Sequence, residues 1–233
     1  MTDRTNNTAI IAAAGIGSRM QAGRAKQLIE LGGVPLLVHT LRRFEDCSAV
    51  DNVILVLQPS LTAEVLALAS RHNFTKITRV VAGGAERQDS VYRGLQVITP
   101  ETAGVVAIHD AARPFVKPDE IRTVIELAAS KGAALLAVPA TDTIKQVRSG
   151  RVQRTLDRKG IYHAQTPQAF QYSIIREAYD RAFEDGFVGT DDSQLVERIG
   201  HRVSVVEGSY TNIKITRPFD LRLAEAIDAE FFK

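Results

Sequence analysis

AIIAAAGIGSRM, residues 9–20, joins an uninterrupted apolar run to a turn that contains two glycines. Further apolar runs follow along the chain at 53–57, 77–81, 105–108 and 133–138. Between the runs, segments 61–72 and 118–131 place their apolar side chains on one helical stripe. Apolar strands that alternate with amphipathic helices indicate right-handed βαβ units. We therefore expect an α/β fold with a mostly parallel, twisted sheet and helices on both faces.

Length and composition favour one soluble globular domain. The chain has 233 residues, of which 45% are apolar and 24% are charged, as is usual for a globular protein. The net charge of +2 gives no basic field for nucleic acid, and the sequence contains no apolar run of about 18 residues that could span a membrane. The single cysteine, Cys47, cannot form an internal disulfide, and the first residues lack the apolar stretch of a secretory signal. We expect one cytoplasmic domain over residues 1–233, with no nucleic-acid or membrane partner.

Segments rich in glycine, alanine or charged residues follow the predicted strands. They are residues 14–19, 83–90, 109–114 and 139–143. In a parallel sheet, the carboxyl ends of the strands lie at one edge, and ligands bind there. We therefore expect the functional site where these four segments meet.

The first of these segments suits a phosphate group, but its pattern alone is a weak signal. A dinucleotide-binding fingerprint needs Gly or Ala where Met20 stands, and a Walker loop needs a Gly-Lys-Ser/Thr ending that is missing. The glycine turn is followed by Arg19, Arg24 and Lys26, and cations combined with backbone amides suit a nucleotide triphosphate. A tight turn with solvent-exposed cations explains the same pattern equally well.

Asp110 ends the fourth apolar run and is a candidate metal ligand. Mg²⁺ prefers one or two carboxylates together with phosphate oxygens and water. Helix capping, or an ion pair with Arg113, is the alternative role for this carboxylate. The preceding His109 has no His or Cys partner at ligand spacing, which favours packing or hydrogen bonding over metal binding.

Residues 145–159 concentrate positive charge in a nearly neutral chain. The segment holds six basic residues and one acid, Asp157, and it contains a Ser149-Gly150 turn between two extended arms. This pattern predicts a β-hairpin, which is either a solvated arm or a surface that binds an anion. Downstream, 202–207 and 212–216 are strand candidates, and Pro218 favours the start of a final helix.

Eight motifs occur in an order typical of one enzyme family. They are AAAGIGSRM at 12–20, KQ at 26–27, GGAERQDSV at 83–91, HDAARP at 109–114, DTIK at 142–145, HAQTPQ at 163–168, TDD at 190–192 and NIKIT at 212–216. Together they closely resemble the 2-C-methyl-D-erythritol 4-phosphate cytidylyltransferases of the non-mevalonate isoprenoid pathway. The resemblance covers residues 9–223.

This resemblance implies a Rossmann-like fold of the nucleotidyltransferase type and a defined reaction. The phosphate of methylerythritol phosphate would attack the α-phosphorus of CTP in line and release pyrophosphate. The product would be 4-diphosphocytidyl-2-C-methyl-D-erythritol, and no covalent enzyme intermediate would form.

The resemblance also implies roles for individual residues. Arg19 and Lys26 stand where the family stabilises the transition state, and Arg158 and Lys214 stand where it holds the sugar phosphate for attack. Asp110 stands at the metal position, with Mg²⁺ or another divalent cation as the expected ion. The expected substrate contacts are Asp110, Arg113, Thr143, Arg158 and Lys214. The expected nucleotide contacts are Ala13, Ala14, Gly15, Gly17, Gly83, Gly84, Ser90 and Ala111.

In this family the hairpin arm embraces a second subunit, so the resemblance implies a homodimer with shared active sites. Residues 141–160 would form the dimerisation arm. Thr143 and Arg158 would then act in the neighbouring subunit's site, which would explain the basic charge of the arm.

Two other functions remain open on sequence grounds. A ribitol-5-phosphate cytidylyltransferase shares the glycine loop and the metal aspartate, and a missing methyl group gives only about 1–3 kcal/mol of discrimination. A non-catalytic sensor that binds CTP is the alternative from a different class. The joint presence of Arg19, Lys26, Asp110, Arg158 and Lys214 argues against the sensor, because binding alone needs no cations directed at a transition state.

Overall fold

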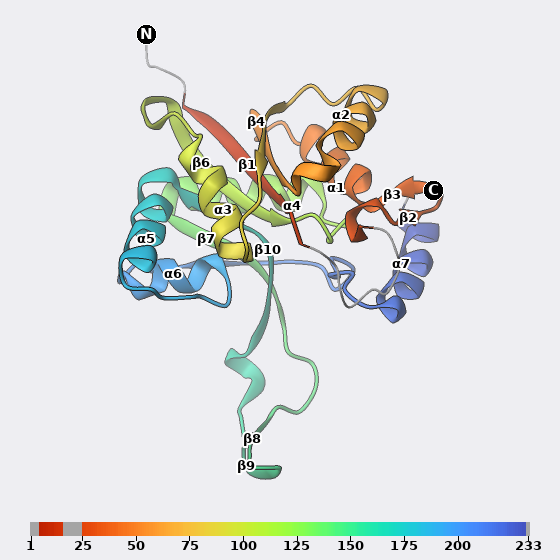
Figure 1. Ribbon diagram of the computed structural model, residues 1–233. Coiled ribbons are helices and arrows are strands. Elements are labelled where there is room, and N and C mark those ends of the chain that lie inside the picture. The colour runs from red at the N-terminus through yellow and green to blue at the C-terminus, as the bar shows by residue number, and fades with distance from the viewer. Residues whose placement is uncertain (1–4, 16–24, 232–233) are drawn as a thin grey trace.

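A seven-stranded sheet forms the centre of the computed structural model, which describes residues 5–15 and 25–231 (Figure 1). The strand order is β11-β7-β10-β6-β1-β4-β5. Strand β10 runs antiparallel to β6 and β7, and the other pairs in this sheet are parallel. The strands are β1 (Asn6–Ala13), β4 (Asn52–Leu57), β5 (Ile77–Ala82), β6 (Ala103–Asp110), β7 (Ala133–Pro139), β10 (Tyr162–Gln171) and β11 (Ser204–Glu207).

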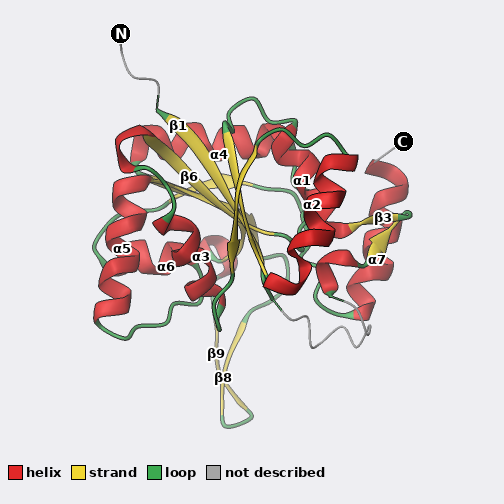
Figure 2. Cartoon of the chain, turned by 45° about the horizontal axis from the view of Figure 1, so that its top comes forward, coloured by secondary structure: helices red, strands yellow, loops and turns green. Residues whose placement is uncertain are grey.

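Helices cover both faces of the sheet, as the sequence predicts (Figure 2). Ile11 packs with side chains of α1, α2 and α4, whereas its neighbour Ile10 packs with α3, α5 and α6 on the opposite face. Successive residues of β1 therefore belong to two different core layers. The helices are α1 (Leu36–Glu45), α2 (Thr62–Arg71), α3 (Arg87–Gln96), α4 (Pro118–Lys131), α5 (Tyr172–Glu184), α6 (Asp192–Arg198) and α7 (Pro218–Phe231).

Short elements connect these layers. Helix α7 packs against the two-stranded sheet of β2 and β3, and Ile215, just before the helix, belongs to the same small core. The short elements are β2 (Glu30–Leu31), β3 (Val34–Pro35) and the 3₁₀ turns η2 (Lys26–Leu28), η3 (Pro59–Leu61), η4 (Pro100–Thr102) and η5 (Arg158–Gly160).

The five apolar runs all form strands of the central sheet, and the final helix begins at Pro218 as predicted. The strand predicted at 202–207 is β11, but the strand predicted at 212–216 is wrong. That segment belongs to no sheet, and the Ile215 N–H donates to the Ala112 carbonyl at 2.9 Å. Within the same segment, Lys214 lines the cavity described below, and the Asn212 carbonyl accepts from Arg113.

The predicted hairpin is present and projects from the body of the molecule (Figure 1). Strands β8 (Lys145–Arg148) and β9 (Arg151–Thr155) pair antiparallel, and every residue of both is exposed. Ser149 and Gly150, with φ of 50° and 74°, form the tight turn. No helix within the described ranges is both long and apolar enough to cross a membrane.

Candidate active site

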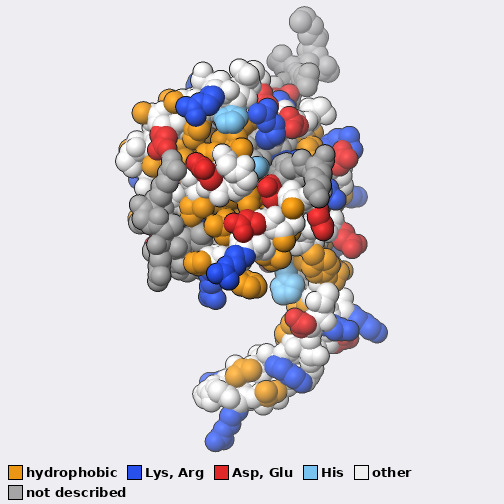
Figure 3. All heavy atoms as spheres, turned by 90° about the vertical axis from the view of Figure 1, so that its right-hand side faces the viewer, with side chains coloured by type: hydrophobic (Ala, Val, Ile, Leu, Met, Phe, Trp, Pro, Cys, Tyr) orange, Lys and Arg blue, Asp and Glu red, His pale blue; other side chains and the backbone are white. Residues whose placement is uncertain are grey.

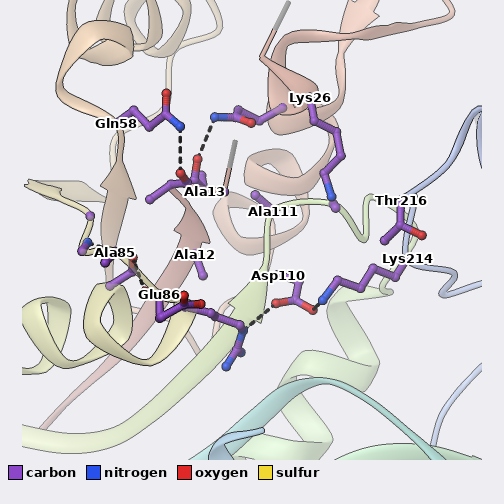
Figure 4. Close-up of a pocket in the computed structure, with 18 of the residues that line it drawn as sticks. Ala12, Ala13, Lys26, Gln58, Ala85, Glu86, Asp110, Ala111, Lys214 and Thr216 are labelled. Atoms are coloured by element: carbon purple, nitrogen blue, oxygen red, sulfur yellow. Dashed lines mark hydrogen bonds and ion pairs between the residues drawn. The ribbon is translucent and has the colours of Figure 1, made fainter. Parts of the chain in front are cut away.

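One cavity of about 650 Å³ lies at the carboxyl ends of β1, β4, β5 and β6 (Figure 4). Three of the four segments that the sequence places at this edge contribute to the lining, namely 14–19, 83–90 and 109–114, whereas no residue of 139–143 lines the cavity. Ten of the predicted site residues line this cavity: Ala13, Ala14, Gly15, Lys26, Gly83, Gly84, Ser90, Asp110, Ala111 and Lys214.

The remaining predicted residues lie elsewhere. Gly17 and Arg19 are outside the described residues. Thr143 and Arg158 are exposed on the arm, where an Nη1 of Arg158 donates to the Thr141 carbonyl, and neither residue lines the cavity of its own chain. Arg113 lies just behind Asp110, with its Nη1 donating to the Asn212 carbonyl at 2.7 Å.

Two glutamines hold the loop that follows β1. The Gln27 Nε2 donates to the Ala13 carbonyl at 2.7 Å, and the Gln58 Nε2 donates to the Ala14 carbonyl at 3.1 Å. In a trans peptide plane the N–H points opposite to the C=O, so these bonds also set the direction of the Ala14 and Gly15 amides. Both glutamines line the cavity, and the sequence motifs assigned neither of them a role.

Glycine lets the loop after β5 approach the loop after β1. A Cβ placed on Gly83 would lie 2.1 Å from the Cβ of Ala14, far inside contact distance. Next along the chain, the Gly84 N–H donates to the Ser90 Oγ at 3.0 Å, which ties the loop to the first turn of α3. The cavity wall on this side is therefore made of backbone.

The Asp110 carboxylate is surrounded by cations. Its Oδ2 accepts from the Lys214 Nζ at 2.7 Å (Figure 4). Its Oδ1 accepts from the Arg87 Nε at 3.0 Å, and the Arg113 Nε lies 3.8 Å from Oδ2. Burial on its own would raise the pKa of Asp110, but Arg87 and Lys214 hold that pKa well below its usual range. The carboxylate is therefore ionised.

Arg87 also lines the cavity, and it is not among the site residues predicted from the sequence. Its Nη1 and Nη2 donate to Asp192 Oδ1 and Oδ2 at 3.0 and 2.7 Å, while its Nε holds Asp110. Asp192 is fully buried and also accepts from the Tyr179 hydroxyl at 2.5 Å. Arg87 and Asp192 each belong to a recognised motif, but spacing along the chain does not show that the two meet.

His109 is buried beneath the site and hydrogen-bonded at both ring nitrogens, consistent with the structural role expected from sequence. The Thr166 Oγ1 lies 3.0 Å from His109 Nδ1 and accepts from the Asp110 N–H at 3.1 Å, and His109 Nε2 lies 3.0 Å from the Arg113 carbonyl. Burial lowers the pKa of His109 to about 4. The ring is therefore neutral near pH 7, with its Nε2–H donating to Arg113.

This neutral histidine predicts a pH dependence of stability. An unfolded histidine has a pKa of about 6.5, so the unfolded chain takes up a proton before folded His109 does. Between pH 6.5 and 4 the free energy of unfolding should fall by up to about 1.4 kcal/mol per pH unit from this residue alone. We expect the stability difference between wild type and His109→Gln to shrink over that range in urea unfolding series. Parallel pH profiles for the two proteins would contradict the assignment.

Among the described residues, two carboxylates line the cavity, Glu86 and Asp110, and Asp110 is the one whose oxygens face the cation cluster. Across residues 5–15 and 25–231, no three His, Cys, Asp or Glu side chains are grouped so as to hold a metal. A single ionised carboxylate fits Mg²⁺ when phosphate oxygens and water complete the coordination. It does not fit a metal held by protein ligands alone.

Comparisons with known proteins agree with this geometry. The family model of 2-C-methyl-D-erythritol 4-phosphate cytidylyltransferase matches residues 7–230. The protein of that name from Halalkalibacterium halodurans is 48% identical to this chain, and the match covers 95% of this chain and 96% of the relative. The one from Syntrophus aciditrophicus is 50% identical, and the match covers 94% of both.

Solved structures give the same result. The 4-diphosphocytidyl-2C-methyl-D-erythritol synthase of Anaerococcus prevotii has a TM-score of 0.85 at 32% identity and covers 96% of both chains. The 2-C-methyl-D-erythritol 4-phosphate cytidylyltransferase of Thermus thermophilus has a TM-score of 0.76 at 33% identity, covering 95% of this chain and 98% of its own. The chain therefore belongs to the 2-C-methyl-D-erythritol 4-phosphate cytidylyltransferase family.

Proposed function

We propose that the cavity carries out the family's reaction, cytidylyl transfer from CTP to 2-C-methyl-D-erythritol 4-phosphate, by direct in-line attack on the α-phosphorus. Family membership over residues 7–230 makes this chain a cytidylyltransferase of isoprenoid precursor synthesis. The observation that carries the mechanism is this cavity, in which two small-residue loops face a cation-rich cluster around Asp110.

CTP fits the side of the cavity that is lined by backbone. We assign the triphosphate to the loop of Ala13, Ala14 and Gly15, in which the Ala13 and Ala14 carbonyls accept from Gln27 and Gln58. We assign the base and ribose to Gly83 and Gly84 of the second loop and to the neighbouring Ser90 and Ala111. Recognition through backbone groups depends on close approach, which glycine permits.

Cations supply the stabilisation that phosphoryl chemistry needs. Negative charge spreads over the oxygens of the α-phosphorus during in-line displacement, and fixed cations that face it lower the barrier. Lys26, at the start of η2, and Lys214, in the segment between β11 and α7, both line the cavity and serve this role, together with Arg19. We assign Lys214 and Arg113 to the sugar phosphate as well, because both lie beside Asp110.

Asp110 is the residue we propose to hold Mg²⁺. Its carboxylate is ionised and lines the cavity, which supports this assignment. Bound there, the ion would neutralise phosphate charge and orient the triphosphate.

One assay tests the function against its alternatives. Pyrophosphate release from CTP and Mg²⁺ is measured with 2-C-methyl-D-erythritol 4-phosphate and with ribitol 5-phosphate in parallel. Turnover with the methylerythritol substrate is expected. Turnover with ribitol phosphate alone would support the rival cytidylyltransferase, and turnover with neither would support a CTP sensor. The comparisons do not favour either alternative.

We further propose that the enzyme is a cytoplasmic homodimer in which residues 141–160 reach the partner's site. The arm lies outside its own cavity, and its charged residues are mostly basic, with hydrophobic side chains between them (Figure 3). A lone two-stranded hairpin is marginally stable in water. A second copy of the chain would cover Val147 and Val152, which are 55% and 60% exposed.

Mixed dimers give a direct test of shared sites. Arg19→Ala and Arg158→Ala subunits should each be nearly inactive alone, because each removes a cation from every site. If Arg158 acts across the interface, exchange between the two variants leaves some sites with both cations intact. About a quarter of the sites in a statistical mixture should then recover, and pyrophosphate release measures this. No recovery, despite subunit exchange shown by native mass spectrometry, would reject sharing.

A further inference from the structure

Arg87 connects the site to the core beneath it through three bonds from one guanidinium. The Nε faces Asp110 in the cavity, and the two terminal nitrogens form a paired, forked contact with Asp192. Arg87 lines the cavity with 32% of its side chain exposed, whereas Asp192 is completely buried. One side chain therefore spans from the reacting groups to the interior.

The far end of this connection is rigidly held. Asp192 is the first residue of α6, and its Oδ1 also accepts from the hydroxyl of Tyr179 on α5. Tyr179 is 1% exposed and its ring stacks on Tyr92. Because Asp192 has a forked arginine and a tyrosine on its two oxygens, its carboxylate has a single favourable orientation, and so has the guanidinium.

We propose that Arg87 is a positioning residue, which acts by fixing the Asp110 carboxylate, and that Asp192 and Tyr179 fix Arg87 in turn. The inference rests on the function proposed for Asp110. Without the Nε contact, Asp110 would rotate towards Arg113, 3.8 Å away, and draw Lys214 with it. The carboxylate and the ammonium group that face the phosphates would then both be misplaced.

The geometry explains why this position needs arginine. A lysine ammonium is a point charge and cannot hold Asp110 and both oxygens of Asp192 at once, whereas the planar fork of arginine can. A purely stabilising role explains the arrangement less well. A protein with a buried ion pair is often no more stable than the same protein with hydrophobic residues of similar volume in its place.

Two variants test the connection at its ends. Arg87→Lys should lower kcat by roughly 10-fold or more, because it removes a charge-assisted bond to Asp110. Tyr179→Phe should lower kcat by roughly 3- to 10-fold through a looser Asp192. Tyr92→Phe is the matched control, since its hydroxyl donates at 2.6 Å to a different aspartate, Asp180, that does not contact Arg87. We expect Tyr92→Phe to keep wild-type kcat.

A double-mutant cycle separates positioning from general stability. If Arg87 acts through Asp110, then Arg87→Lys should cost less than about 3-fold in kcat once Asp110→Asn is already present. A structural effect would multiply the two losses, and that outcome would overturn the inference. Equal kcat for Tyr179→Phe and Tyr92→Phe would also overturn the inference. This comparison can be made even if Arg87→Lys fails to fold. Failure of the proposed function would appear separately, as absence of turnover in the wild type.

Discussion

Lys26→Met should lower kcat by roughly 10²- to 10³-fold, the loss typical of removing one fixed charge or donor from a transition state. Methionine has a similar length and keeps the apolar stem, so the change removes the charge and little else. Lys26 begins η2 and lines the cavity beside the β1 loop. Because the negative charge on the phosphates grows as the reaction proceeds, kcat should fall more than the affinity for CTP. Steady-state pyrophosphate release and calorimetric CTP binding measure the two effects.

Lys76→Met is the control for the loss of one positive charge. The Lys76 Nζ donates to the Phe44 and Cys47 carbonyls, outside the cavity. Its replacement should lower the unfolding temperature and leave kcat per folded enzyme near wild type. Equal losses of kcat in the two variants would show that net charge, and not the position of Lys26, is responsible.

Gly83→Ala should weaken CTP binding by roughly 10-fold or more, because overpacking of this kind costs about 1–3 kcal/mol. The new methyl group would overlap the Cβ of Ala14 and press on the Ser90 Oγ, 3.1 Å away. The two loops would have to separate, and the backbone wall that we assign to CTP would shift. Calorimetric titration with CTP measures the loss.

Gly200→Ala separates this effect from general destabilisation. Gly200 has a φ of 89° and open space around it, so alanine is strained there without touching the cavity. We expect Gly200→Ala to unfold at a lower temperature and to bind CTP normally. If Gly83→Ala binds CTP as well as Gly200→Ala does, then the contact between the loops is not needed for binding.

Sequence patterns predict β1, β4, β6 and β7 because those strands bury apolar residues on both faces. Strand β10 escapes this reasoning, since its sequence YHAQTPQAFQ contains no apolar run. Its buried residues differ in kind. Ala169 and Phe170 join the core, whereas Gln165, Thr166 and Gln168 are polar and each has a hydrogen-bond partner. Gln168, for example, donates to Asp191 at 2.8 Å and accepts from the Ser193 N–H at 2.9 Å. Hydrogen bonds between residues distant in sequence leave no periodic pattern, so only the fold reveals them.

The candidate site was predictable to the extent that its residues follow strands. Asp110 and the two glycine-containing loops fall at strand ends, and motif resemblance adds Lys26 and Lys214. The supporting contacts were not predictable. Gln58 follows a strand but belongs to no recognised motif, and the bond between Arg87 and Asp192 requires the whole sheet to be in place.

The bond between Arg87 and Asp192 also bears on how the protein folds. The two residues are 105 positions apart, and the bond from Arg113 to Asn212 spans 99. Closing such long loops costs chain entropy that local helices do not incur, so contacts of this kind form late. During refolding, helical structure should therefore return before the Asp110 carboxylate reaches its final orientation. We therefore expect the pocket to be among the last parts of the molecule to acquire its native form.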